Sequence, residues 1–152
     1  MIYLAADKHG YKAIKYAEEF LKANKISFVN FGVKERTDAK GVKALKDMKL
    51  EDMIPPVVEK VLKNKSLAIL SCGTGVGVEV GANKFSGIRA CLATSPKIAE
   101  WSKIYDNCNV LCLVGWNCTK KQINSILKSW FKAEYDGDKQ RLKMFKTFNE
   151  WH

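Results

Sequence analysis

The segment Ser71-Cys72-Gly73-Thr74-Gly75-Val76-Gly77 places a thiol beside a glycine-rich turn, and these residue types at this spacing are suited to chemistry. Glycines let consecutive backbone N–H groups converge, and a following helix N-terminus adds positive potential. Such a turn holds an anion or a developing oxyanion next to the thiol. The alternative is an inert buried thiol, because free cysteine is among the most buried residue types. The glycine spacing matches neither an ATP-binding loop nor a dinucleotide fingerprint.

The elements that position this turn are predicted from apolar runs that alternate with amphipathic segments. Strands are predicted at 3–5, 26–31, 67–71, 88–92 and 109–114. Helices are predicted around 12–22, over 51–62 with Pro55 and Pro56 in its first turn, over 78–84, after Ser95-Pro96, after a Thr119–Gln122 capping box, and in a C-terminal arm over 138–152. Residues 33–50 lack a clear pattern, and we interpret them as an irregular insertion, a loop followed by a loose helical turn.

The connections between the predicted strands are long enough for parallel crossovers, which need about a dozen residues. We therefore predict one domain over 1–152, of the α/β class: a three-layer α/β/α sandwich on a five-stranded parallel, Rossmann-like sheet. Ligands bind beyond the carboxyl ends of the strands in such sheets. This places Asp7 and Lys8, after the first strand, on the same rim as Cys72.

The bulk composition excludes several classes of protein. The net charge of +10 raises nucleic-acid binding as an alternative, but the lysines are spread along the whole chain, which favours a solvated surface and no nucleic acid. The five cysteines are odd in number and form no CxxC pair, which indicates reduced thiols and a cytoplasmic protein. With only two histidines, a zinc site would lack its usual ligands. The N-terminal residues indicate neither a signal peptide nor a membrane span.

The segment around the Cys72 thiol resembles a known protein family. Cys72 to Gly77, followed by Ala82-Asn83-Lys84-Phe85 and Gly87-Ile88-Arg89-Ala90, resembles the most distinctive block of the ribose-5-phosphate isomerase B family, which also contains the galactose-6-phosphate isomerase subunits. Further matching residues are Asp7, Gly10, Asn109-Val110-Leu111, Trp130 and Tyr135-Asp136-Gly137. The resemblance covers nearly the whole chain apart from residues 33–56.

The resemblance implies an aldose–ketose isomerase, an intramolecular oxidoreductase that uses no metal and no cofactor. Its partner would be a small sugar phosphate, and it would be a homodimer or homotetramer with active sites shared between subunits. Cys72 would move a proton between C1 and C2 of the open-chain sugar, and Thr74 would position or protonate an oxygen. Asp7 and Tyr105 complete the implied catalytic set. The implied substrate-binding residues are Lys8, His9, Gly73, Gly75, Val76, Gly77, Asp106 and Asn107, and the implied phosphate-binding residues are Lys139, Arg141 and Lys143.

Several positions depart from the family pattern. Tyr105 stands where the family has a ring-opening histidine, and a phenol holds its proton more tightly than an imidazole at pH 7. Ring opening would then be slower, be shared with Asp106, or be unnecessary for a substrate that cannot cyclise. Lys8 replaces a histidine and has an open role in contacting an anion or a hydroxyl. Trp116 replaces an arginine, and packing is favoured there over sugar stacking.

The C-terminal cations have two interpretations. Lys139 and Lys143 keep the charge of the family's arginines but lose their bidentate fork, and they equally fit a solvated helix face. Ribose 5-phosphate is the default substrate. The alternatives are a tetrose or hexose phosphate, such as galactose 6-phosphate or allose 6-phosphate, or a homologue that binds sugar phosphates without catalysis.

Overall fold

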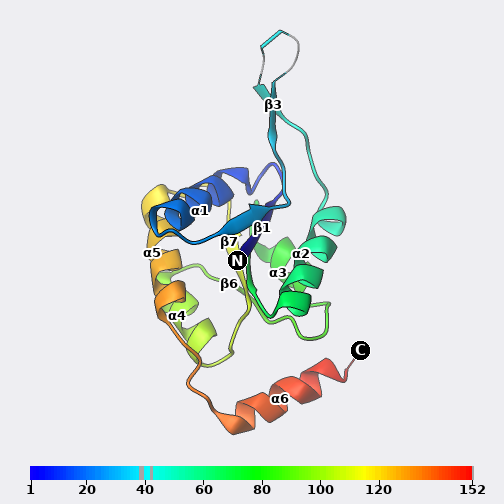
Figure 1. Ribbon diagram of the computed structural model, residues 1–152, viewed down its shortest axis with the longest axis vertical. Helices are drawn as coiled ribbons and strands as arrows, with labels where there is room; N and C mark the ends of the chain where they lie inside the picture. Colours follow the sequence, from blue (N-terminus) through cyan, green and yellow to red (C-terminus); the bar gives the residue numbers. More distant parts are fainter. Residues whose placement is uncertain (38–39, 42, 152) are drawn as a thin grey trace.

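The computed structural model describes residues 1–37, 40–41 and 43–151 and shows a parallel sheet between two layers of helices (Figure 1). The sheet has the order β2-β1-β5-β7-β6, and each of its pairings is parallel. Its strands are β1 (Ile2–Ala6), β2 (Phe28–Asn30), β5 (Leu67–Cys72), β6 (Ala90–Leu92) and β7 (Val110–Val114). The α/β class and the parallel five-stranded sheet predicted from the sequence are confirmed.

Two apolar clusters fill the spaces between the sheet and its helices. One face is covered by α1 (Tyr11–Ala23), α4 (Pro96–Ile104) and α5 (Lys120–Lys132), and the other by α2 (Leu50–Asn64) and α3 (Val76–Ala82). In β5, Ile69 packs toward α1 and α5, whereas Leu70 and Cys72 pack toward α2 and α3. Strands that are buried on both faces need apolar residues at consecutive positions, which explains the unbroken apolar run of β5.

The helix starts follow the capping chemistry of the sequence. The Ser95 side chain accepts a hydrogen bond from the Ile98 backbone N–H at 3.2 Å. Thr119 and Gln122 form both bonds of a capping box at the start of α5. The prediction for α2 was wrong in one respect: α2 begins at Leu50, so Pro55 and Pro56 lie in its second turn and remove two backbone donors from the helix.

The described part of residues 33–50 contains a projecting two-stranded ribbon and ends at Leu50, the first residue of α2. β3 (Glu35–Thr37) pairs antiparallel with β4 (Lys43–Leu45), and the ribbon extends beyond the sheet (Figure 1). The predicted loop and loose helical turn are therefore wrong for these residues, while 38–39 and 42 lie outside the described residues. Each strand is only three residues long, which leaves too few positions for a periodic signal.

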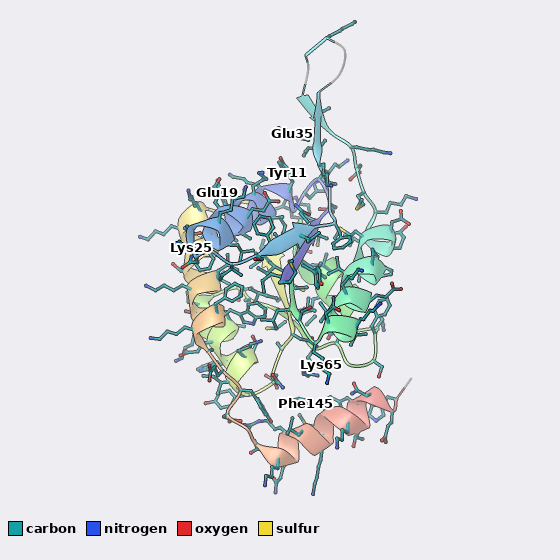
Figure 2. All side chains as sticks on the ribbon, viewed as in Figure 1. Tyr11, Glu19, Lys25, Glu35, Lys65 and Phe145 are labelled. Carbon is teal, nitrogen blue, oxygen red and sulfur yellow. The ribbon has the colours of Figure 1, made fainter. Side chains whose placement is uncertain are left out.

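The C-terminal arm contains α6 (Lys139–Asn149), within the predicted range 138–152, of which His152 lies outside the described residues. α6 lies at the end of the molecule opposite to the projecting ribbon (Figure 1). The side chain of Phe145, labelled in Figure 2, is buried, and the Arg89 guanidinium lies 5.3 Å from the centre of its ring. The Gly87 backbone N–H donates to the Asn149 side chain at 2.8 Å. These contacts attach α6 to the sheet domain.

No helix within residues 1–37, 40–41 and 43–151 has the length and apolar character needed to cross a bilayer.

Candidate active site

Three loops meet at the carboxyl ends of neighbouring strands. Ala6 is paired with Ser71, and Cys72 with Val114, so the loops that follow β1, β5 and β7 leave the sheet side by side. The β1–β5 boundary is also where the chain switches from one side of the sheet to the other. This is the position at which open α/β sheets bind ligands.

Glycines allow these loops to interlock. A Cβ on Gly10 would lie 2.3 Å from the carbonyl carbon of Ser71, and a Cβ on Gly115 would lie 2.2 Å from the carbonyl oxygen of His9. The Gly115 N–H donates to the Cys72 carbonyl oxygen at 2.9 Å. The loop after β1 is thus held directly against the backbone of the thiol residue.

Asp7 shapes the loop after β1. Its Oδ1 accepts hydrogen bonds from the backbone N–H groups of His9 at 2.9 Å and Gly10 at 2.8 Å, which is the geometry of an Asx turn. The Lys8 ammonium turns toward the ribbon side and pairs with Asp47 at 3.2 Å. This hydrogen bond lowers the pKa of the Asp47 carboxyl. In the single chain, Asp7 therefore organises the loop and Lys8 contacts a carboxylate.

Cys72 is the last residue of β5 and its side chain is 5% exposed. Its sulfur lies 3.7 Å from the position that a Cβ of Gly77 would occupy, at the first turn of α3. The Leu50 side chain approaches the same Gly77 position to 2.8 Å. The thiol therefore lies at the rim edge of the apolar cluster, between the sheet and the glycine turn.

The glycine turn has the conformation that its sequence requires. Gly75 is in the left-handed region with φ of 77°, and a Cβ there would lie 2.4 Å from the Leu92 side chain. The Thr74 hydroxyl accepts a hydrogen bond from the Val76 backbone N–H at 3.2 Å. The hydroxyl proton of Thr74 is therefore free to be donated outward, because Thr74 is exposed.

Trp116 follows β7 after Gly115 and lies on the same rim. Its indole edge contacts Gly73, where a Cβ would lie 2.4 Å from Cε2, and the His9 ring meets the indole edge-on at 6.0 Å. Even so, 55% of Trp116 is exposed. The sequence favoured packing for this residue, and the indole does pack against Gly73 and His9 although more than half of the residue is exposed. The signal that marks it is an aromatic residue in the second position after β7, the strand that pairs with the strand of Cys72.

Most of the other sequence-predicted residues lie at the opposite end of the sheet, where its strands begin. Tyr105, Asp106 and Asn107 lie between the end of α4 and the start of β7, at the amino ends of the strands, and α6 follows this edge. Cys72 pairs with Val114, four residues along β7 from Val110, which alone is about 13 Å at the usual rise per residue. One chain therefore holds two separate groups of candidate residues.

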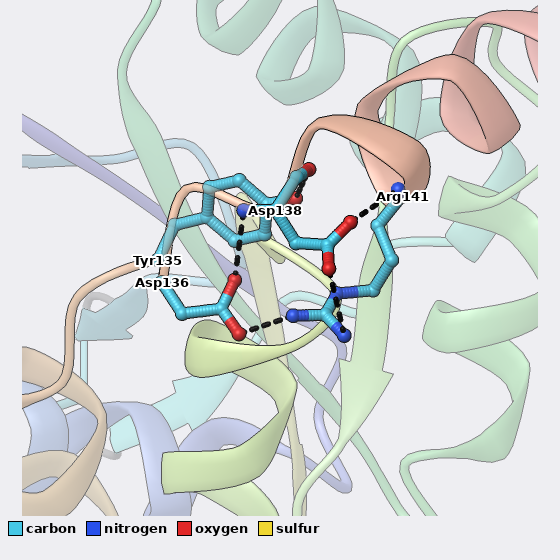
Figure 3. Close-up of polar contacts among 4 residues, drawn as sticks. All are labelled: Tyr135, Asp136, Asp138 and Arg141. Atoms are coloured by element: carbon cyan, nitrogen blue, oxygen red, sulfur yellow. Dashed lines mark hydrogen bonds and ion pairs between the residues drawn. The ribbon is translucent and has the colours of Figure 1, made fainter.

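The second group is organised around Arg141. Its guanidinium pairs with Asp136, lies 3.9 Å from Asp138, and stands 5.3 Å from the centre of the Tyr105 ring (Figure 3 shows the ion pairs). The bond to Asp136 raises the pKa of Arg141 and lowers the pKa of Asp136. The Tyr135 hydroxyl donates to the Asp138 carbonyl oxygen at 2.5 Å. These contacts fix the start of α6.

Some of the remaining residues of this group are anchored by hydrogen bonds, and others have exposed side chains. The backbone carbonyls of Asp106 and Asn107 accept from Arg89 Nε at 3.1 and 2.9 Å, which anchors that turn. The side chains of Lys139 and Lys143 are exposed on α6. A cavity of about 450 Å³ lies beneath α6 and includes Asp106 in its lining, but Cys72 does not line it.

Fold and rim together define a parallel α/β protein that carries a thiol and a glycine turn at the topological switch of its sheet. The chain belongs to the ribose/galactose isomerase family, whose sequence model matches residues 2–146. This family membership makes it a sugar-phosphate isomerase by class, and the resemblance inferred from the Cys72 segment is confirmed.

Individual relatives carry different substrate names. The chain is 35% identical to the probable ribose-5-phosphate isomerase B of Mycoplasma genitalium, over 95% of this chain and 91% of that protein. It is 34% identical to galactose-6-phosphate isomerase subunit LacB of Clostridium acetobutylicum, over 60% of this chain and 54% of that protein. The ribose-5-phosphate isomerase B structure of Clostridium thermocellum superposes with a TM-score of 0.84 at 26% identity, covering 98% of this chain and 95% of the other.

Proposed function

We propose that this protein interconverts a phosphorylated aldose and ketose through an enediolate, with ribose 5-phosphate and ribulose 5-phosphate as the default pair. The observation that carries the proposal is the position of Cys72, at the end of β5 beside the glycine turn and tied by backbone bonds to the loop after β7. The ribose-5-phosphate isomerase B name of a relative matched over nearly its full length supports the default substrate.

The chemistry requires one base that serves two neighbouring carbons. The Cys72 thiolate removes the proton from C2 of the open-chain aldose, and the C2–H electrons form the C1–C2 double bond as the C1 carbonyl becomes an enediolate oxygen. The thiol then returns a proton to C1, either the one it removed or one exchanged with solvent, while a proton moves from the C2 hydroxyl to the C1 oxygen and the C2 carbonyl of the ketose forms. Backbone N–H groups of the turn from Gly73 to Gly77, other than that of Val76, which donates to Thr74, stabilise the charge on oxygen, and the Thr74 hydroxyl exchanges a proton with it.

The complete site needs two copies of the chain. In one chain, Cys72 is separated from Tyr105 and from the α6 cations by the length of the sheet. We propose a homodimer or homotetramer in which a second copy supplies Tyr105, Asp106, Asn107, Lys139, Arg141 and Lys143 to the rim of the first. Exposed apolar side chains on and after α6 support an association through this arm: Leu142 is 40%, Phe148 39% and Trp151 69% exposed.

Two other functions have specific support. A tetrose or hexose phosphate is favoured by the many altered contacts, and a relative named galactose-6-phosphate isomerase subunit supports a hexose. A binding homologue without catalysis is favoured by the Lys8–Asp47 and Arg141–Asp136 ion pairs, because in them the cations expected to contact the substrate are already paired with carboxylates.

All five cysteines are unpaired, which supports a cytoplasmic location.

A substrate panel tests the proposal. Purified protein is assayed with ribose 5-phosphate, allose 6-phosphate, galactose 6-phosphate and tetrose phosphates. Cys72→Ala should lose turnover of the best substrate by at least about a thousandfold, because no other base replaces the thiol. Cys118→Ala is the matched control, since Cys118 is 6% exposed and Cys72 5%. Turnover that survives in Cys72→Ala would refute the role of the thiol, and ligand binding without turnover would favour the binding homologue.

A further inference from the structure

Trp116 is a large aromatic side chain that is held in place yet remains mostly exposed. Its backbone N–H donates to the Gly73 carbonyl oxygen at 3.0 Å, and its indole edge is in contact with Gly73. The His9 ring packs against it at an interplanar angle of 81°. With 55% of the residue exposed, these contacts position the indole without burying it.

The indole nitrogen of Trp116 belongs to the ring edge that lies against Gly73 of the glycine turn. Of the three indole atoms nearest to a hypothetical Cβ on Gly73, one is Nε1, at 2.9 Å. Within the described residues, the Trp116 Nε1–H donates to no protein acceptor. An apolar ring and an unused donor therefore lie together against Gly73, the residue that follows Cys72 in the chain. Binding pockets for small molecules combine apolar surface and a few placed polar groups in this way.

We propose that Trp116 contacts the carbon chain of the sugar phosphate and thereby determines which sugar phosphates the site accepts. This inference rests on the proposed isomerase function. The ring covers C–H groups of the substrate, and Nε1–H donates to a hydroxyl or carbonyl oxygen that lies at the turn. An indole carries no charge, so it discriminates between sugars by the length and shape of the carbon chain, and the phosphate is bound by the cations.

The test compares Trp116→Ala and Trp116→Phe with the control variant Trp101→Ala. Trp101 lies on α4 and is 44% exposed. KM and kcat are measured with the best substrate, together with the inhibition constant of inorganic phosphate. Trp116→Ala should raise KM about tenfold, and Trp116→Phe, which keeps a ring and loses the donor, about threefold. The phosphate inhibition constant should change less than about twofold in both, since phosphate has no carbon chain. The ratio of kcat/KM values between sugars should also change in Trp116→Ala.

The possible contrary results distinguish a failure of the Trp116 inference from a failure of the proposed isomerase function. If Trp116→Ala has the kinetic constants of Trp101→Ala, Trp116 does not contact the substrate and the inference fails. A parallel rise of KM and of the phosphate inhibition constant would show that the variant deforms the turn, which also overturns it. If the wild-type protein turns over no sugar phosphate, the proposed function itself has failed. Thermal melting of each variant shows whether a loss reflects unfolding.

Discussion

A site composed from two chains makes a quantitative prediction for mixed subunits. Cys72→Ala removes the base from one half of the site, and the double variant Lys139→Ala/Lys143→Ala removes two exposed cations from the other half. The ammonium groups of the two lysines have no hydrogen-bond or ion-pair partner within the described residues, and alanine keeps the backbone bond that Lys143 accepts from Thr147, so we expect the fold to stay intact. Cys72→Ala should lose at least about a thousandfold in turnover, and the double lysine variant about a hundredfold in kcat/KM, at roughly 1.4 kcal/mol for each lost phosphate contact.

Mixing the parents should restore activity. Equal amounts that are unfolded together and refolded give about half mixed dimers, and each mixed dimer holds one intact site and one doubly defective site. About one quarter of all sites are then intact, and the mixture should show about one quarter of the wild-type rate. Sites contained within one chain cannot recover in this way. A mixture whose rate is only the mean of the two parents, with mixed dimers shown by native mass spectrometry, would refute the two-chain site.

Three further predictions concern folding. Burial lowers the pKa of Lys103 from 10.5 to about 8, so the unfolded chain binds more protons between these values, and the free energy of unfolding should rise with pH across that window. After allowance for solvent screening the rise is about 1 kcal/mol, and urea denaturation of Lys103→Met should show none of it. Gly10→Ala places a Cβ 2.3 Å from backbone atoms of Ser71, so it should lower stability by about 2–4 kcal/mol and shift the urea midpoint; an unchanged midpoint would contradict that packing. Asp138→Ala removes the cap on the Arg141 N–H, at a cost of about 1 kcal/mol, and amide exchange should quicken in α6 but not in α5.

The parallel sheet was predictable because its strands are buried on both faces. Such strands need unbroken apolar runs, as in Leu67 to Cys72, and the capping groups Ser95 and Thr119 are local signals that tertiary packing did not override. The β3–β4 ribbon was not predictable in the same way. Its three-residue strands are too short to show periodicity, and the sequence of a short exposed ribbon resembles that of a loop.

The residues at the carboxyl ends of the strands were predictable. The separation of the candidate residues into two groups, at opposite ends of the strands, was not predicted from the sequence. Asp7 directly follows β1 and Cys72 is the last residue of β5, which places both at carboxyl ends. Asn107 lies shortly before a strand, so it belongs to the amino ends, and that signal was present in the order of elements. The exposure of Trp116 could not be predicted, because it depends on a contact with Gly73 that only the folded chain creates.

The central claim is that the Cys72 thiol carries a proton between neighbouring carbons of a phosphorylated sugar. The most direct measurement is the reaction of the best sugar-phosphate substrate in D₂O, followed by NMR or mass spectrometry of the recovered sugars. We predict deuterium at the carbon that exchanges its proton with Cys72 in the wild-type and Cys118→Ala proteins, and none above the uncatalysed level in Cys72→Ala. Deuterium incorporation at the wild-type rate by Cys72→Ala would contradict the account.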